Sequence, residues 1–345
     1  MRLLRRLMSP LRAKVDEIAG PLRTKLDKIL ASQGHSFAAS RRLAERQLLL
    51  SGQLASFEVR RLTEIDTLAD VEFSVTSQWG EDGIIEWLVQ KLPGIDRSFV
   101  EFGVENFGEA NARFLLQNRG WRGLAMDGSE AHMNHLRSET LYWRYDLVAE
   151  CAFVTAENIN ALLKKHGFDG DLGILSVDID GNDYWVLKAI DCVQPALLIA
   201  EINGVFGDRH AITIPYDPSF ERLKAHHSGQ YFGASLQAMI ALAKEKGFTF
   251  LGTNSNGVNA FFVRDDLEDQ VMPSIRTVKA WPARHRDARN EAGELVFTRG
   301  TAKADLVAEM PVYDIDRKTE LSLGELFPLY SEDWQKDLTT PPANG

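Results

Sequence analysis

The stretch Phe99-Val-Glu-Phe-Gly-Val-Glu-Asn-Phe-Gly108 decides the fold of this chain. It begins as an apolar run around one carboxylate, reaches a glycine at Gly103, and continues through a polar turn into the helical pattern of residues 109–117. A second apolar run follows and ends in Asp127. Glycine lets the backbone approach a ligand closely, and an acid at the tip of the second strand can hold both hydroxyls of a ribose. The pattern therefore predicts a site for a nucleoside-containing cofactor.

The region around this stretch, from residue 75 to residue 264, alternates strand-like and helix-like patterns without a Gly/Ser-rich linker. Helical stretches such as Thr155–His166 and Asp183–Ile190 separate the first five expected strands, which predicts parallel βαβ units. Only residues 254–258 join the last two, and so short a connection must reverse the chain into an antiparallel hairpin. The expected strands are Phe99–Val104, Gly123–Asp127, Leu141–Asp146, Gly173–Asp178, Ala196–Glu201, Phe248–Thr253 and Asn259–Arg264.

The pattern predicts the α/β class, with a Rossmann-like, mostly parallel, seven-stranded sheet that ends in a C-terminal antiparallel hairpin. Five parallel strands followed by such a hairpin are unusual for a dehydrogenase-type dinucleotide fold. They are typical of class I S-adenosylmethionine-dependent methyltransferases. We expect this domain at residues 71–266, an extension packed on it at residues 267–330, and a loose tail at residues 331–345.

Residues 1–70 are predicted to form a basic helical arm, because apolar residues recur there at steps of three and four. The first 61 residues carry 13 Lys/Arg and five Asp/Glu, whereas the rest of the chain carries 26 and 44. The arm can pack as a helical hairpin or coiled coil that makes the protein a homo-oligomer. Alternatively, it can lie on an anionic membrane surface or bind a partner enzyme.

Composition excludes several classes of protein. The strongly acidic body argues against nucleic-acid binding, which needs a basic surface. With only Cys151 and Cys192, the chain has no disulfide framework and no cysteine-based zinc site. No apolar run approaches the roughly 18 residues that span a bilayer, and the N-terminus lacks the pattern of a signal peptide. We therefore expect a cytoplasmic protein, peripheral at the inner face of the membrane if the arm binds lipid.

Five motifs in the same order resemble those of bacterial FkbM-like methyltransferases, a group linked to polysaccharide and other glycan biosynthesis. They are Ser77-Gln-Trp-Gly-Glu-Asp-Gly-Ile-Ile85, Glu101-Phe-Gly103, Val177-Asp-Ile-Asp-Gly-Asn-Asp-Tyr184, Gly233-Ala-Ser-Leu236 and Gly257-Val-Asn-Ala-Phe-Phe-Val263. The resemblance covers residues 72–320. It implies S-adenosyl-L-methionine as cofactor and a sugar or polysaccharide precursor as the acceptor of a methyl group on oxygen.

The glycine loop departs from the common methyltransferase pattern acid-x-Gly-x-Gly-x-Gly. Glu105 and Phe107 stand at the second and third glycine positions. A dinucleotide needs those glycines for the approach of its pyrophosphate, whereas S-adenosylmethionine has no phosphate. The departure therefore weakens a dehydrogenase interpretation more than a methyltransferase one.

The cofactor site is expected to draw on the tips of the first four strands. In this resemblance Glu101 contacts the methionine end, Asp127 holds the ribose, and Asp146 or Phe153 meets the adenine. Glu101 can also be a strand-end carboxylate satisfied by backbone N–H groups, and Asp127 can also cap a helix. The expected cofactor-binding residues are Glu101, Gly103, Asn106, Asp127, Gly128, Asp146 and Asp178.

Acids also follow the fourth and fifth expected strands, whose carboxyl ends face the site in an open α/β sheet. By resemblance to the Mg²⁺ arrangement of catechol-type O-methyltransferases, Asp178, Glu201 and Asn203 are candidate metal ligands, with Asp180 as an alternative. Such a metal would lower the pKa of a substrate hydroxyl. The same acids can instead cap the next helix and bind loop amides, with no metal.

Without a metal, the reaction needs a general base, and the candidates are Asp180, His210 and His227. Two other functions stay open. The chain can be a non-catalytic scaffold or binding module in a glycan-synthesis complex, since its glycine loop is altered. It can also be a metal-dependent enzyme of another class on the same scaffold.

Overall fold

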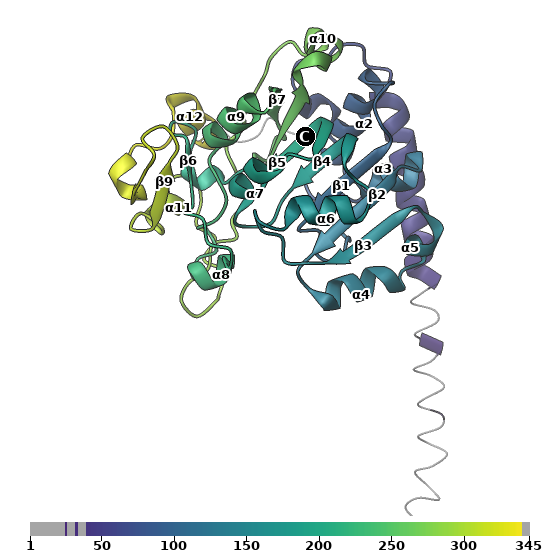
Figure 1. Ribbon diagram of the computed structural model, residues 1–345, viewed down its shortest axis with the longest axis horizontal. Helices are drawn as coiled ribbons and strands as arrows, with labels where there is room; N and C mark the ends of the chain where they lie inside the picture. The colour runs from purple at the N-terminus through teal and green to yellow at the C-terminus, as the bar shows by residue number, and fades with distance from the viewer. Residues whose placement is uncertain (1–24, 26–31, 34–38, 340–345) are drawn as a thin grey trace, which may run out of the picture. The chain divides into compact units, whose positions relative to one another are not determined.

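The computed structural model describes residues 25, 32–33 and 39–339, and the chain divides into two compact units, Met1–Ser51 and Gly52–Gly345 (Figure 1). In the first unit, residues 39–51 are helical, and half of the predicted arm lies outside the described residues. The second unit begins earlier than the predicted boundary at residue 71. Leu68 and Val71, in the short 3-10 helix η1 (Leu68–Val71), are buried in its core, and Ile65 pairs with Ile275.

A seven-stranded sheet forms the centre of the second unit, in the order β3-β2-β1-β4-β5-β8-β7 (Figure 1). The five strands from β1 to β5 are parallel, and β8 is antiparallel to both of its neighbours. The predicted fold class is confirmed, including the hairpin. The strands are β1 (Ser98–Phe102), β2 (Arg122–Asp127), β3 (Leu147–Cys151), β4 (Gly170–Val177), β5 (Val193–Glu201), β7 (Phe248–Thr253) and β8 (Asn259–Arg264).

Helices cover both faces of this sheet, because alternate residues of each buried strand point to opposite faces. In β1, Val100 and Phe102 belong to one core and Phe99 to the other. Each fully buried side chain of this size contributes about 1.5–3 kcal/mol. The first core packs on α6 (Ile159–Lys165), α7 (Asp183–Ala189) and α9 (Leu236–Glu245); the second packs on α2 (Glu81–Lys91), α3 (Arg113–Arg119), α4 (Glu130–Ser138), α5 (Thr140–Arg144) and α10 (Glu268–Val271).

The C-terminal part of the chain builds a second, three-stranded antiparallel sheet of order β10-β9-β6. Its first strand comes from the loop after β5 and pairs with a strand of the C-terminal extension. The strands are β6 (Ile212–Thr213), β9 (Pro311–Asp314) and β10 (Thr319–Ser322). The remaining elements are η2 (Gly204–Phe206), α8 (Arg222–Ala225), η3 (Asp265–Leu267), η4 (Met272–Ser274), α11 (Ala302–Asp305), η5 (Leu323–Leu326) and α12 (Glu332–Thr339).

Two predicted elements are wrong. The aromatic run expected as strand Leu141–Asp146 is mostly the helix α5, in which only Leu141 is buried, and the third strand begins at Leu147. The tail expected to be loose from Ser331 is ordered as α12 up to residue 339. Trp334 is buried there, and Lys279 pairs with Asp337 at 2.6 Å.

Within the described residues, no helix combines the length and the apolar character needed to cross a bilayer.

Candidate functional site

A cavity of about 200 Å³ lies beyond the carboxyl ends of the first four strands. In open α/β sheets this edge is where ligands bind. The loops after β1, β2, β3 and β4 each contribute to its wall. Among the predicted cofactor residues, those that line it are Gly103, Asp127, Gly128 and Asp178; Phe153, the alternative for the adenine, lines it as well.

Asp127 ends β2 and ties two loops together at the cavity wall. Its Oδ1 accepts the N–H of Ser129 at 2.8 Å and lies 3.2 Å from Nδ1 of His132, at the start of α4. Its Oδ2 accepts the N–H of Glu105 at 2.9 Å, in the loop after β1. A carboxylate offers about four acceptor positions, so Asp127 keeps capacity for a ligand hydroxyl. The cap and the ribose-binding role are therefore compatible.

Gly103 lines the cavity, but the reason why this position requires glycine differs from the one expected. Its φ is +80°, and a Cβ there would lie 1.4 Å from the carbonyl oxygen of Asp178. The close approach that demands glycine is thus made by the end of β4, within the chain itself. Any larger residue would push the first and fourth strand ends apart.

The loop after β1 keeps a glycine-like backbone without the glycines. Glu105 and Phe107 have φ of 47° and 62°, in the left-handed region that non-glycine residues rarely occupy. Each such residue costs about 1–3 kcal/mol unless its surroundings enforce the conformation. Phe107 is fully buried and stacks on Phe99 with ring centroids 6.4 Å apart. The altered sequence therefore still forms the tight loop.

The other predicted cofactor residues lie elsewhere. Glu101 is buried and accepts the N–H groups of Asn111 and Ala112 at 2.7 and 3.0 Å, which fixes the start of α3. Burial raises the pKa of Glu101 to about 7. Asn106 accepts the N–H of Gly108 and is not part of the cavity wall. Asp146 precedes β3 at the opposite edge of the sheet, because the strand expected to end there begins there.

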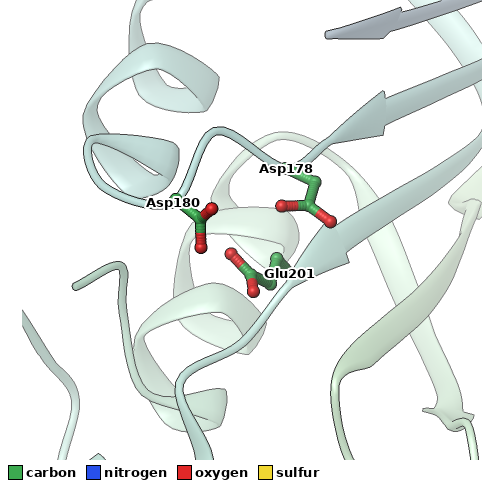
Figure 2. A group of neighbouring side chains, drawn as sticks. All are labelled: Asp178, Asp180 and Glu201. Atoms are coloured by element: carbon green, nitrogen blue, oxygen red, sulfur yellow. The ribbon is translucent and has the colours of Figure 1, made fainter. Parts of the chain in front are cut away.

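Three carboxylates meet beside the cavity, at the ends of β4 and β5 (Figure 2). Asp178, Asp180 and Glu201 each place an oxygen within 4.8 Å of the others. Burial, and then repulsion between the acids, raises the pKa of Asp178 and of Glu201 well above their usual range. Within the described part of the chain, Oε2 of Glu201 has no hydrogen-bond partner. The group thus offers only oxygen atoms, and one of them lacks a hydrogen-bond partner.

Asn203 is not part of this group. Its amide nitrogen donates to the carbonyls of Gln230 and Phe232, and its oxygen accepts the N–H of Val205, which caps η2. Among the predicted metal ligands, the structure brings together Asp178, Glu201 and the alternative, Asp180.

A buried carboxylate that sequence reasoning did not select shapes the loop bearing Asp180. Asp183 accepts the N–H groups of Ile179 at 2.7 Å and Gly181 at 2.9 Å, so the loop wraps around it. Asp180 takes a left-handed φ of 54° between them. Burial raises the pKa of Asp183 to about 6. Asp183 therefore positions Asp180 at the cavity.

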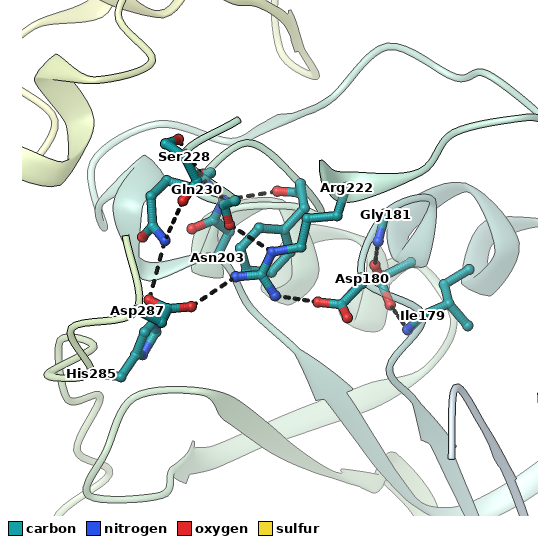
Figure 3. A network of polar contacts seen from close by, with 12 residues as sticks. Ile179, Asp180, Gly181, Asn203, Arg222, Ser228, Gln230, His285 and Asp287 are labelled. Carbon is teal, nitrogen blue, oxygen red and sulfur yellow. Dashed lines mark hydrogen bonds and ion pairs between the residues drawn. The ribbon is translucent and has the colours of Figure 1, made fainter. Parts of the chain in front are cut away.

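A second cavity, of about 470 Å³, adjoins the first, because Phe153, Ile179, Asp180 and Phe220 line both. Arg222, at the start of α8, forms part of its wall. Its guanidinium pairs with Asp180 on one side and with Asp287 at 3.2 Å on the other (Figure 3). The sequence offers no signal for this bridge, because Arg222 is 42 residues from Asp180 and 65 residues from Asp287.

The two predicted histidine bases do not line either cavity. The carbonyl of His210 accepts the hydroxyl of Ser235, and His227 stacks on His226 with ring centroids 4.3 Å apart. Asp180 is thus the one candidate base among the three that reaches both cavities.

No protein-family model matches the chain, and no curated protein matches it in sequence. Solved structures of methyltransferases are distantly similar. The N-terminal domain of EvdMO1 with SAH bound is 12% identical, over 65% of this chain and 94% of that one, with a TM-score of 0.36. The O-methyltransferase from Bacillus cereus in complex with SAH is 16% identical, over 61% and 89%, with a TM-score of 0.36. A S-adenosylmethionine-dependent methyltransferase from Clostridium acetobutylicum ATCC 824 is 12% identical, over 53% and 90%, with a TM-score of 0.35.

Proposed function

We propose that this protein is an S-adenosylmethionine-dependent methyltransferase that binds its cofactor in the first cavity. The observation that supports this is the charge of the wall. Four lining residues are acids, Glu105, Asp127, Asp178 and Asp180, and none of the described lining residues is Lys or Arg. S-adenosylmethionine carries a sulfonium and an ammonium group against one carboxylate, so its net charge complements this wall. A pyrophosphate would be repelled.

We assign individual residues of the cavity wall to the parts of this cofactor. Asp127 accepts from the ribose hydroxyls, and Phe153 and Gly128, which lie against each other, face the adenine. The buried amide oxygen of Asn182 has no partner among the described residues and accepts a donor from the ligand. The bound cofactor supplies an electrophilic methyl group, and the acids around Asp178 favour its cationic end.

We place the acceptor oxygen at the junction of the two cavities, beside Asp180. With the cofactor bound, the methyl carbon would exchange its bond to the sulfonium sulfur for a bond to the acceptor oxygen, leaving S-adenosylhomocysteine, and the Asp180 carboxylate would accept the hydroxyl proton. Phe153 and Phe220 line both cavities and offer ring faces to the apolar side of a sugar. Together with the resemblance to FkbM-like enzymes, this favours O-methylation of a sugar or glycan precursor.

A divalent cation is the second candidate for activating the hydroxyl. The group Asp178, Asp180 and Glu201 offers only oxygen ligands, as Mg²⁺ prefers, and one oxygen of Glu201 is unsatisfied. We rank it second because Arg222 already neutralises Asp180. Calorimetric titration with MgCl2 separates the two, since a metal site predicts heat of binding that Glu201→Gln abolishes. If wild-type protein gives no such heat, the metal is excluded.

The cofactor assignment is tested by calorimetry of the full chain with S-adenosylhomocysteine and, separately, NAD⁺. We expect the first to bind and the second not to bind. Asp127→Asn should weaken S-adenosylhomocysteine about tenfold to a hundredfold, because hydrogen bonds to a charged group contribute about 1.5–3 kcal/mol. Asp146→Asn is the matched control, since that exposed acid lies at the other edge of the sheet. Absence of binding by wild type would favour the scaffold alternative.

A further inference from the structure

The second cavity has a charge balance unlike that of the first. Its wall carries three acids, Asp180, Glu221 and Asp287, and two arginines, Arg222 and Arg289. Whether the cavity attracts a cation or an anion depends on which of these charges are already paired within the chain.

Each of the three acids has a cationic partner. Asp180 pairs with Arg222, and Asp287 pairs with Arg222 and with the buried Lys303, both at 3.2 Å. Glu221 pairs with Lys224 at 2.5 Å. The acids therefore do not leave the cavity negative.

The charge of Arg222 is already balanced within the chain, because its guanidinium pairs with two carboxylates. Besides its two carboxylates, its Nε donates to the carbonyl of Gly229 at 2.6 Å, and its guanidinium lies 3.7 Å from the centre of the Phe232 ring (Figure 3). It is a fixed part of the wall that holds the loop after β6 against the C-terminal extension.

Arg289 is different. It is exposed, and Nη1 donates to the carbonyl of Gly293 at 2.8 Å, across a small hairpin in which Arg289 pairs with Leu295. In the part of the chain that the structure describes, no carboxylate lies within ion-pair distance of it. Among the described residues, Arg289 is thus the lining charge that has no carboxylate partner.

Exposed apolar side chains stand beside these charges. Phe153 is 49% exposed and Leu223 is 63% exposed, and both line the cavity with Phe220. A ring face, an unpaired guanidinium and the Asp180 carboxylate together suit a sugar that carries an anionic group. Arginine pairs with carboxylates and phosphates through two parallel hydrogen bonds, which also fixes their orientation.

We propose that the second cavity binds the acceptor and that the acceptor is an anionic sugar, either a uronate or a sugar phosphate, whose charged group pairs with Arg289. The sugar ring packs on Phe153 and Phe220, and a hydroxyl meets Asp180. The inference rests on the proposed methyltransferase function. It adds the charge of the substrate and the residue that selects it.

The test uses the full chain saturated with S-adenosylhomocysteine and titrated with D-glucose, D-glucuronate and D-glucose 1-phosphate. We expect at least one anion to bind about tenfold or more tightly than glucose, and the tighter of the two identifies its class. Arg289→Gln should reduce the affinity for that anion to the affinity for glucose. Arg289→Lys should retain part of the preference for the anion. Arg286→Gln is the matched control, because Arg286 is exposed in the same segment but does not line the cavity.

Equal affinities for the three sugars, or no binding by any of them, would overturn the inference, as would an unchanged preference in Arg289→Gln. Binding of S-adenosylhomocysteine in the same samples shows whether the proposed function itself holds. A protein that binds S-adenosylhomocysteine but prefers no anionic sugar therefore keeps the function and loses this acceptor. Melting temperatures of the Arg289 variants confirm that they are folded.

Discussion

The two adjoining cavities share four residues yet have opposite electrostatics. The wall of the first is acidic, with Asp178 among carboxylates that have no basic partner on that wall. In the second, cations pair with every lining acid and Arg289 is left over. Once these ion pairs are counted, the charges favour a cationic ligand in the first cavity and, through Arg289, an anionic ligand in the second. Asp180 is the residue at which the two meet, since it lines both.

The buried titratable groups near the two cavities also differ. Under the first, burial raises the pKa of Glu101 to about 7 and that of Asp183 to about 6, so these acids tend toward neutrality. Beside the second, burial lowers the pKa of His285 to about 4 and also lowers that of Lys303. Acidic groups are thus buried near the first cavity, whereas basic groups are buried beside the second. Variants can test the two regions separately.

The largest expected effect is that of Gly103→Ala, a substitution in the wall of the first cavity only. The added Cβ would lie 1.4 Å from the Asp178 carbonyl, and alanine would have to adopt a φ of +80°. We expect a loss of stability on the order of 3 kcal/mol or more, and loss of S-adenosylhomocysteine binding. Gly94→Ala is the control, since nothing lies within 4 Å of a Cβ there. Urea unfolding of both variants measures the difference, and equal midpoints would show that β1 and β4 are not in close contact.

Arg222→Met is expected to have the next largest effect and to act on the second cavity. Methionine keeps apolar contact with Phe232 but leaves Asp180 and Asp287 without this partner. We expect a loss of about 2 kcal/mol, together with loss of any preference for anionic sugars. Arg276→Met should cost less than about 1 kcal/mol, because both members of its pair with Glu64 are exposed. Denaturant unfolding and sugar titration are the measurements; retained anion preference would contradict the assigned charge balance.

Much of the fold could be predicted because local patterns and tertiary structure agree along β1, β2, β4 and β5. Continuous apolar runs ending in polar loops leave little choice for a strand buried on both faces. The prediction of the third strand was wrong because the aromatic composition of residues 141–146 favours a strand. In the structure, Trp143 lies on a helix and is 74% exposed. Local composition could not reveal which of two neighbouring segments the sheet would accept.

The candidate site was predictable only where a residue's position at a strand tip decides its role. Asp127, Asp178 and Asp180 follow that rule, and the structure places them at the first cavity. Asp183, Arg222, Asp287 and Arg289 do not follow it, because their roles depend on contacts between loops far apart in the chain. Asn203 also follows a strand, but its side chain caps η2 and is not part of the acidic group.

The smallest effects are pH dependences of opposite sign. Between pH 4.5 and about 7 the folded protein keeps the Glu101 proton that the unfolded chain has released, so stability is lost as pH rises through this window. Between pH 6.5 and about 4 the folded protein excludes the His285 proton that the unfolded chain binds, so stability is lost as pH falls. Each slope is at most about 1.4 kcal/mol per pH unit. Glu101→Gln should reduce the first loss, to which Asp183 also contributes, and leave the second unchanged. His285→Gln should reduce the second loss and leave the first unchanged. Unfolding free energies of wild type and both variants at pH 4.5, 5.5 and 7.5 measure this, and slopes that the two substitutions change in the same direction would remove the contrast between the regions.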